Sequence, residues 1–227
     1  CTLYGDIHYH AVGDCSYQIL EGAFWNDLSV DRFFLVDQLQ GDVSFDIVNV
    51  YDLSITMNNG EQVIIINHFR NQKFDMEQII FADGTVYDGD AIKAKALADQ
   101  AATGIVDGTW DGDFYVHTSG MGSYTINDVS RSAEHDRLYL SEFDVDQVVF
   151  SQDANHGLVI TMENGETITI PRHFDPYRSD RFDIEEIEFA DGTVLDLDGI
   201  TAKSLADQVP SGLVRGTEGE DVYIHEA

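Results

Sequence analysis

A long internal duplication constrains the fold of this chain more than any other feature of its sequence. Two stretches that each end in Leu-Ala-Asp-Gln share 17 of 24 letters, and the correspondence continues backwards at an offset of about 105 to 108 residues. The matching pairs are 2–19 with 109–126, 53–69 with 158–174, and 77–100 with 185–208. A repeat of this length predicts similar folding units in tandem.

The repeat also sets the expected domain boundaries. The 227-residue chain divides into a first unit at 1–107 and a second at 108–215, and residues 216–227 match the start of a third. Each full unit is long enough to bury a core of its own. Because 43% of the residues are hydrophobic and 11% aromatic, the composition is that of a globular protein and not of a disordered one.

Most of each unit has the residue pattern of β-strands. Apolar side chains alternate with polar ones over 53–57, as expected for a strand with one buried face. Asn59-Gly60 follows, and the second unit repeats the dipeptide at Asn164-Gly165. Both residue types tolerate the positive φ of a type I′ turn, so we expect antiparallel hairpins here. The repeated Asp-Gly dipeptides at 83–84 and 191–192 predict further hairpins.

The end of each unit has a helical pattern. An Ala-, Lys- and Leu-rich segment follows Asp90 in the first unit and Asp198 in the second, so these aspartates are the expected N-caps. Helical spacing places Ile92, Ala96 and Leu97 on one face. The sequence therefore predicts an all-β protein of tandem antiparallel β-rich units, of β-sandwich or β-roll type, each closed by a short helix.

The charge of the chain restricts its partners. There are 42 acidic residues against 12 basic ones, giving a formal net charge of −30. Such a field repels nucleic acid and anionic membrane surfaces and attracts cations. No apolar run is long enough to span a bilayer. General solvation of the surface and binding of divalent cations both explain the excess of carboxylates, and both stay open.

Aspartates and glycines gather where the units begin. Calcium takes several oxygen ligands, which turns rich in these residues commonly supply. The candidate ligands are Asp6, Asp111, Asp113 and Asp221, and further acidic residues lie nearby at Asp27, Asp31, Asp128 and Asp136. The Asp-Gly pairs inside the hairpins are better explained as turn residues.

Histidine recurs at equivalent positions of the repeat. His10, His117 and His225 each follow an apolar strand pattern, while the partner of His8 in the second unit is Tyr115. A zinc-binding pair is therefore not repeated, and a structural role is favoured for these residues. The same holds for His68 and His173, which each precede a phenylalanine and for which packing or capping is expected.

Two cysteines, Cys1 and Cys15, lie near the N-terminus. They are able to pair in an oxidising compartment, but two thiols form neither a disulfide framework nor a zinc motif. No nucleophile motif or phosphate-binding glycine loop occurs. An active site is seldom duplicated along one chain, whereas binding and structural surfaces often are. We therefore expect a protein that is not an enzyme.

Several stretches resemble the haemolysin-type calcium-binding (RTX) proteins, and in particular the long repeat related to them. They are "GTEGEDVY", "GMGSYTI", "DRLYL", "LVITMENGETITI" and above all "IEEIEFADGTVLD". The resemblance implies a secreted bacterial protein with calcium-stabilised β-rolls that acts in adhesion, in surface layers, in toxins or beside extracellular enzymes. Nonapeptides of the Gly-Gly-x-Gly-x-Asp kind do not occur, and Tyr17 and Tyr124 stand where the family carries a ligating aspartate.

Three functions follow as expectations. The first is an extracellular structural or adhesive module that polymerises through its terminal strand, Val222, Tyr223, Ile224 and His225, with neighbouring repeats or other copies as partners. The second is a calcium-binding module of a secreted protein. The third is a carbohydrate-binding accessory module in which Tyr115, Trp25 and Trp110 stack on sugar rings.

Overall fold

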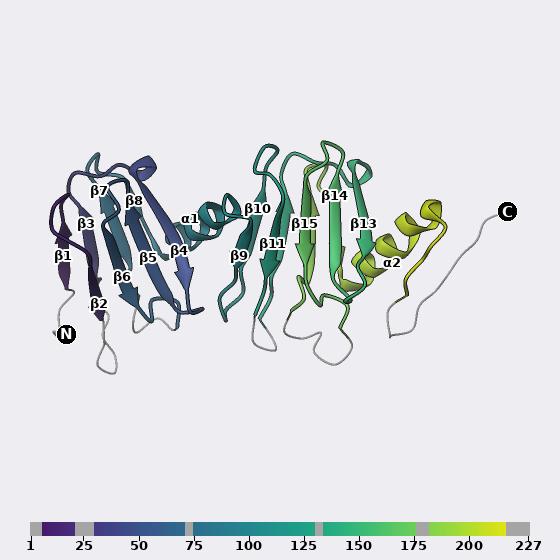
Figure 1. Ribbon diagram of the computed structural model, residues 1–227, viewed down its shortest axis with the longest axis horizontal. Helices are drawn as coiled ribbons and strands as arrows, with labels where there is room; N and C mark the ends of the chain where they lie inside the picture. Colours follow the sequence, from purple (N-terminus) through teal and green to yellow (C-terminus); the bar gives the residue numbers. More distant parts are fainter. Residues whose placement is uncertain (1–5, 21–29, 71–74, 130–133, 176–181, 217–227) are drawn as a thin grey trace. The chain divides into compact units, whose positions relative to one another are not determined.

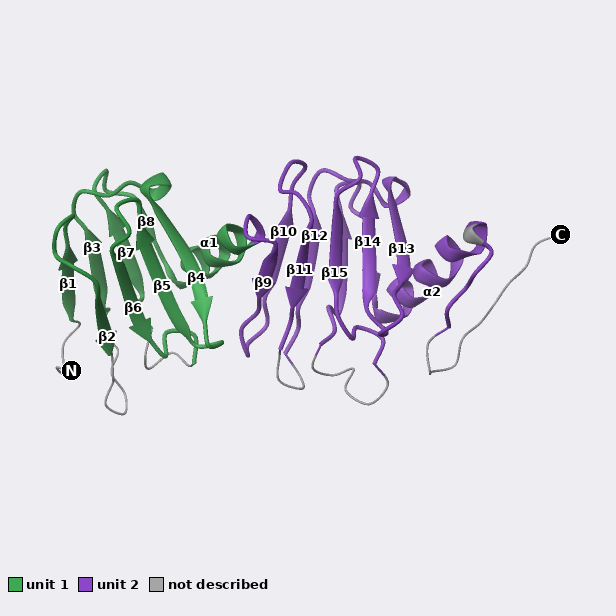
Figure 2. Ribbon diagram, viewed as in Figure 1, with its two compact units in different colours: residues 1–100 green, residues 101–227 purple. Residues whose placement is uncertain are grey.

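The chain folds into two compact units, residues 1–100 and 101–227 (Figure 2). The computed structural model describes residues 6–20, 30–70, 75–129, 134–175 and 182–216. Within these residues no helix is long and apolar enough to cross a membrane. The units divide a few residues before the repeat boundary at 107/108, so that boundary remains a prediction from the sequence.

The described residues of the first unit form two four-stranded sheets and one helix (Figure 1). One sheet has the strand order β1-β3-β7-β8 and the other β2-β6-β5-β4. The strands are β1 (Ile7–His10), β2 (Tyr17–Leu20), β3 (Arg32–Leu35), β4 (Val43–Val48), β5 (Asp52–Met57), β6 (Gln62–Ile66), β7 (Gln78–Phe81) and β8 (Val86–Tyr87), with a 3-10 turn, η1 (Gln40–Asp42), and the closing helix α1 (Gly89–Ala101).

As far as the two units are described, the second repeats this arrangement and adds one strand. Its sheets have the orders β10-β12-β16-β17 and β13-β14-β15-β11-β9. The elements are β9 (Ile105–Asp107), β10 (Phe114–His117), β11 (Tyr124–Asn127), β12 (Arg137–Leu140), η2 (Val145–Gln147), β13 (Val148–Gln152), β14 (Leu158–Met162), β15 (Thr167–Ile170), β16 (Glu186–Phe189), β17 (Val194–Asp196), α2 (Leu197–Gln208) and η4 (Val209–Ser211). The added strand is β9, which pairs with β11.

The sheets are mixed and largely parallel, so the prediction of purely antiparallel units is wrong. The first strands of the unit alternate between the two sheets: β1 lies in one, β2 in the other, β3 in the first again, and β4 to β6 in the second before the chain returns with β7. A strand that returns to its sheet after crossing the other one runs in its original direction, and β1–β3, β3–β7 and β2–β6 are accordingly parallel pairs. The prediction of mostly β tandem units that each end in a helix is confirmed.

Hairpins form where the sequence predicts them, but with another turn type. β5 and β6 pair antiparallel around Asn59-Gly60, and β14 and β15 around Asn164-Gly165. Only the glycine of each pair has a positive φ, 87° at Gly60 and 89° at Gly165. A type I′ turn requires positive φ at both central residues. Instead, the Asn59 side chain accepts the N–H of Glu61, and the longer loop needs only one left-handed residue.

The cores lie between the paired sheets. In the first unit the rings of Phe45 on β4 and Phe81 on β7 lie 6.5 Å apart, and Phe150 and Phe189 form the equivalent contact of 6.2 Å in the second. Since each pair joins one sheet to the other, the two sheets of a unit pack face to face.

The caps of the closing helices lie two residues earlier than the sequence predicts. The cap of α1 is Asp88, whose carboxylate accepts the N–H of Ala91, and Asp196 holds the N–H of Gly199 in α2. Asp90 and Asp198 lie inside the first turn. The predicted apolar face is confirmed, because Ile92, Ala96 and Leu97 are all buried.

Each helix also closes an edge of a sheet. Asp99 of α1 accepts the N–H of Phe45 in the edge strand β4 at 2.8 Å, and Asp207 of α2 does the same for Phe150 in β13. Lys95 and Lys203 pair with these carboxylates one turn earlier in their helices. A backbone donor that an open edge would present to another chain is thereby satisfied.

Candidate functional site: a buried cluster of three aspartates

Carboxylates hold the points at which the parallel strands begin. The N–H of Asp113, just before β10, donates to Oδ1 of Asp136 at 2.7 Å, and the N–H of Asp136 donates to Oε2 of Glu185 at 2.7 Å. The first unit has the same ladder, from Asp6 to Asp31 and from Asp31 to Glu77. Each carboxylate satisfies a backbone donor of the neighbouring strand entry, so acidic residues are required here for structural reasons.

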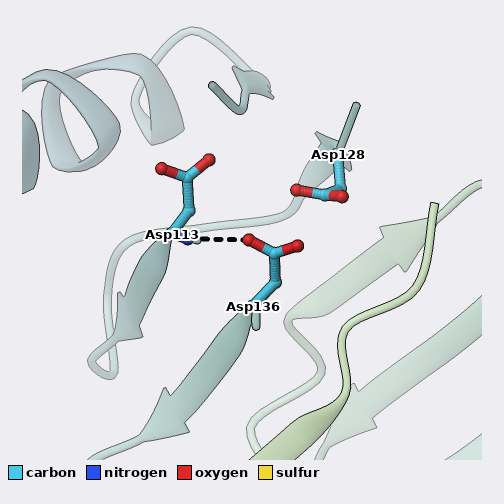
Figure 3. Close-up of side chains that lie close together, drawn as sticks. All are labelled: Asp113, Asp128 and Asp136. Carbon is cyan, nitrogen blue, oxygen red and sulfur yellow. Dashed lines mark hydrogen bonds between the residues drawn. The ribbon is translucent and has the colours of Figure 1, made fainter. Parts of the chain in front are cut away.

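In the second unit this ladder joins a further carboxylate to form a cluster. Asp113 precedes β10, Asp128 follows β11 and Asp136 precedes β12, so three separate segments converge (Figure 3). One carboxylate oxygen of each residue lies within 4.8 Å of the others. The exposed fractions of the three residues are 2%, 3% and 0%. The cluster is therefore almost closed to bulk water.

Polar groups around the cluster orient two of its carboxylates. Thr109 donates its N–H to Asp113 Oδ2 at 2.6 Å and its hydroxyl to Oδ1 at 2.9 Å. The Tyr115 hydroxyl lies 3.0 Å from Asp128 Oδ1 and 3.3 Å from Asp113 Oδ2. A Cβ atom at Gly108 would lie 2.4 Å from that hydroxyl, so a residue without a side chain is needed beside it.

The electrostatics of the cluster favour a cation. Burial, followed by the negative charges of the three aspartates, raises the pKa of Tyr115 well above its usual value, so the phenol stays protonated and donates. Carboxylates this close in a site of low dielectric repel one another unless a proton or a cation lies among them. The donor set consists of oxygen atoms, which suits a hard divalent cation such as Ca²⁺ or Mg²⁺ and not zinc.

The first unit does not show the same cluster among its described residues. Asp6 and Asp31 occupy the positions of Asp113 and Asp136, but both are half-buried. The residue aligned with Asp128 is Glu21, which lies outside the described residues.

The remaining sequence candidates lie elsewhere. Asp111 is exposed and its side chain is not part of the cluster. Tyr115 is buried, so the prediction that its ring stacks on a sugar at the surface is wrong. Trp110 is half-buried. Cys15 is an exposed free thiol. The other candidates, Cys1, Trp25, Asp27, Asp221 and the strand Val222, Tyr223, Ile224 and His225, lie outside the described residues.

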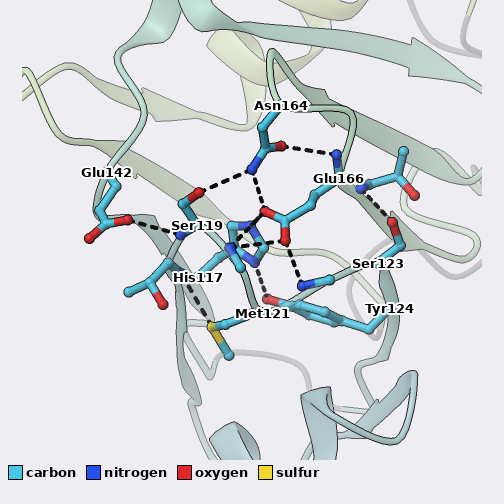
Figure 4. A network of polar contacts seen from close by, with 12 residues as sticks. His117, Ser119, Met121, Ser123, Tyr124, Glu142, Asn164 and Glu166 are labelled. Carbon is cyan, nitrogen blue, oxygen red and sulfur yellow. Dashed lines mark hydrogen bonds and ion pairs between the residues drawn. The ribbon is translucent and has the colours of Figure 1, made fainter.

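A second polar network surrounds a buried histidine of the repeat (Figure 4). Nδ1 of His117 lies 3.2 Å from the Tyr124 hydroxyl, and Nε2 lies 3.4 Å from Oε2 of Glu166. Glu166 also accepts the N–H of Gly122 at 2.7 Å and that of Gly120 at 3.0 Å. One carboxylate thus holds both the turn after β10 and the imidazole. The first unit repeats this with His10, Glu61 and Gly13.

Opposing influences set the protonation of this network. Burial lowers the pKa of His117, while the charge of Glu166 and its hydrogen bond act against that effect. Partial burial works to raise the pKa of Glu166, but hydrogen bonds from Asn164, Gly122 and Gly120 outweigh it, and that pKa is lowered. The network therefore contains a carboxylate and a mostly neutral imidazole near neutral pH.

Replacing Glu166 by Gln tests this account. The pKa of His117 is expected to fall further, because the neighbouring negative charge is lost while the shape of the side chain is kept. The second unit should also lose about 1 kcal/mol of stability, since its backbone donors lose a charged acceptor. Histidine NMR titration measures the pKa. Glu163→Gln, at an exposed position of the same hairpin, is the control; an equal response in both variants would contradict the proposed contact.

The other repeated histidines have a packing and hydrogen-bonding role. His68 and His173 are buried, and Nδ1 of each accepts a backbone N–H, from Met76 and Ile184 respectively. Burial lowers the pKa of each to about 3. They are neutral structural residues, as their pattern in the sequence predicts.

The fold and the site together define a mostly β repeat protein with a candidate carboxylate site for a hard cation. Residues 52–91 and 158–198 each match the family described as haemolysin-type calcium binding protein related domain, so the chain carries two copies of that domain. The matched segments begin at β5 and β14 and end at the start of α1 and in the first turn of α2. The three aspartates lie between them. No curated protein matches the chain.

Proposed function

We propose that this chain is a non-catalytic structural module of an extracellular repeat protein, and that calcium stabilises its second unit. The observation that carries the proposal is the convergence of Asp113, Asp128 and Asp136, buried and with oxygens within 4.8 Å of one another. The calcium in the name of the matched family supports the choice of ion. The repeated scaffold supports a structural or adhesive role over an enzymatic one.

Calcium would act here as a cross-link. The three aspartates would supply carboxylate ligands from the entries of β10 and β12 and from the end of β11. A bound cation cancels the repulsion between the carboxylates and so stabilises the strand entries that they hold. The ladder of N–H donors to Asp136 and Glu185 keeps the backbone in place at the same time.

Calcium is expected to raise the melting temperature of the second unit by several degrees over that of chelator-treated protein, because it binds only the folded state. Asp128→Asn should abolish this increment. The same substitution should leave the calcium-free protein as stable as before or more stable, since it removes a repelling charge. A general loss of structure would not combine these two effects. Calorimetry in calcium and in chelator measures them, with Asp111→Asn as the control.

Terbium provides a second readout. The ion binds calcium sites, and excitation of a tyrosine as close as Tyr115 should sensitise its emission. We expect emission that calcium displaces and that Asp128→Asn removes. Melting curves that are identical in calcium and in chelator would contradict the proposal, even if exposed carboxylates of this acidic chain bind calcium or terbium weakly.

A further inference from the structure

A strand pairing in the second unit shows how one unit receives a strand from the segment that precedes it. β9 follows α1 directly in the chain and pairs in parallel with β11, with Ile105 opposite Thr125 and Val106 opposite Ile126. The N–H of Thr125 donates to the carbonyl of Gly104 and the N–H of Gly108 to that of Asn127, both at 3.0 Å. Val106 of this strand is buried.

The first unit has the receiving strand without this partner among its described residues. β2 is the equivalent of β11 and pairs in parallel with β6, just as β11 pairs with β15. On its other side β2 is the edge of its sheet as far as the chain is described. Leu20, at the end of β2, is 65% exposed. This edge therefore presents backbone groups and an apolar side chain.

The segment after α2 repeats the segment that forms β9. Gly-Leu-Val-Arg-Gly at 212–216 aligns with Gly-Ile-Val-Asp-Gly at 104–108. Gly212 has a φ of 76° and Gly104 a φ of 89°, so both segments leave their helix through a left-handed glycine. Within the described residues, 213–216 belong to no strand, and Leu213 is exposed. Gln208 holds the segment by accepting the N–H of Arg215 at 3.0 Å.

We propose that residues 213–215 of one copy of this chain add as a parallel strand to β2 of a second copy. The register of β9 on β11 places Leu213 opposite Gln18, Val214 opposite Ile19, and Arg215 opposite Leu20. Gln18 then donates its N–H to the carbonyl of Gly212, and Gly216 donates to Leu20. The partner is thus a second copy of the chain. This inference rests on the proposed structural role of the module, but it does not depend on calcium binding.

Physical chemistry sets the expected behaviour of this contact. Main-chain hydrogen bonds supply the pairing, and burial of Val214 against the edge adds an apolar contribution. Because only a short segment is paired, the affinity should be weak, and association should become detectable only at high protein concentration. Two copies with a net charge of −30 each repel one another, and salt should therefore strengthen the assembly by screening.

Sedimentation velocity from micromolar to millimolar concentration tests the proposal. The wild-type chain should associate, and more so at high salt. Val214→Asp should weaken association by about tenfold or more, because pairing would bury an unpartnered charge. Val209→Asp is the matched control: it adds the same charge at an exposed position outside the segment and should have little effect. Equal weakening in both variants, or a monomer under all conditions, would overturn the inference.

Cross-linking tests the register. In a Cys1→Ser, Cys15→Ser background, Gln18→Cys combined with Leu213→Cys should yield intermolecular products with a short bis-maleimide, whereas Gln18→Cys with Val209→Cys should not. Cross-links within one chain, or equal yields for both pairs, would count against strand addition between copies. If the wild-type chain does not assemble but calcium still raises its melting temperature, only this inference is overturned. If it assembles but calcium does not change its melting temperature, only the calcium site is overturned.

Discussion

Lowering the pH from 8 to 5 is expected to remove about 2 kcal/mol from the stability of each unit through a single buried histidine, His68 in the first unit and His173 in the second. The pKa of each is about 3 in the folded protein, against an ordinary value of 6.5. At pH 5 the unfolded chain is protonated over about 1.5 pH units that the folded chain does not follow, at 1.36 kcal/mol per unit.

The direction follows from proton binding. Both folded pKa values are lowered, so the unfolded state binds more protons and stability falls as the pH drops below 6.5. The loss continues until about pH 3, where the folded histidines also become charged. The lowered pKa of His117 acts in the same direction in the second unit. The pKa values of carboxylates such as Glu61 and Asp191 are lowered by hydrogen bonds, so their contribution to stability is also lost as the pH falls, but only once the unfolded carboxylates begin to take up protons, below about pH 5.

His68→Asn and His173→Asn test the prediction. Asparagine keeps an acceptor near the position of Nδ1 but does not titrate, so each variant should lose less stability between pH 8 and pH 5 than the wild type. Urea unfolding at a series of pH values gives the slopes, which are independent of any constant loss caused by the smaller side chain. Parallel slopes for the wild type and the double variant would show that these histidines do not control the acid response.

Gly112→Ala is expected to destabilise the second unit by about 3 kcal/mol. A Cβ atom at Gly112 would lie 2.6 Å from the backbone oxygen of His135 and 3.2 Å from its nitrogen. Neither atom belongs to a flexible side chain, so the entries of β10 and β12 must move apart. That movement would break the hydrogen bond from the N–H of Asp113 to Asp136, and we expect the calcium increment to be lost as well.

Gly41→Ala is the control for this substitution. No atom lies within 4 Å of a Cβ built at Gly41, and its φ is not positive, so the change should alter stability little or raise it slightly. Calorimetry of both variants gives the comparison. If Gly112→Ala proved as harmless as Gly41→Ala, the close approach of the two strand entries would be excluded.

Local signals in the sequence predicted the local structure well. Asn-Gly pairs marked the hairpins, and helical spacing placed Ile92, Ala96 and Leu97 in the core. The parallel pairs had no such signal, because β1 and β3 are joined through a strand of the other sheet. Turn residues report on antiparallel neighbours only. Hence the sequence predicts the strands and the antiparallel hairpins but not the parallel pairing.

Because parallel pairing has no local signal, the sequence predicts the aspartate cluster only in part. The sequence identifies Asp113 as a candidate ligand, and Asp128 and Asp136 only as further acidic residues near the start of the unit. Their convergence depends on the parallel pairing of β10 with β12, which brings two strand entries side by side. An aspartate directly before or after several strands of one unit was the available signal. Asp111 lies in the same Asp-Gly-Asp segment as Asp113, but its side chain is exposed.

The carboxylates of Asp99 and Asp207 restrict which sheet edges can take part in an assembly. They occupy a backbone donor of β4 and β13, so one end of each strand series is closed by its helix, while β2 lies at the opposite end. Two copies are therefore hindered from pairing β4 with β4, or β13 with β13, around a two-fold axis. Addition of a segment from one copy to the β2 edge of the next is heterologous, so the rotation between successive copies decides whether they form a closed ring or an open polar filament.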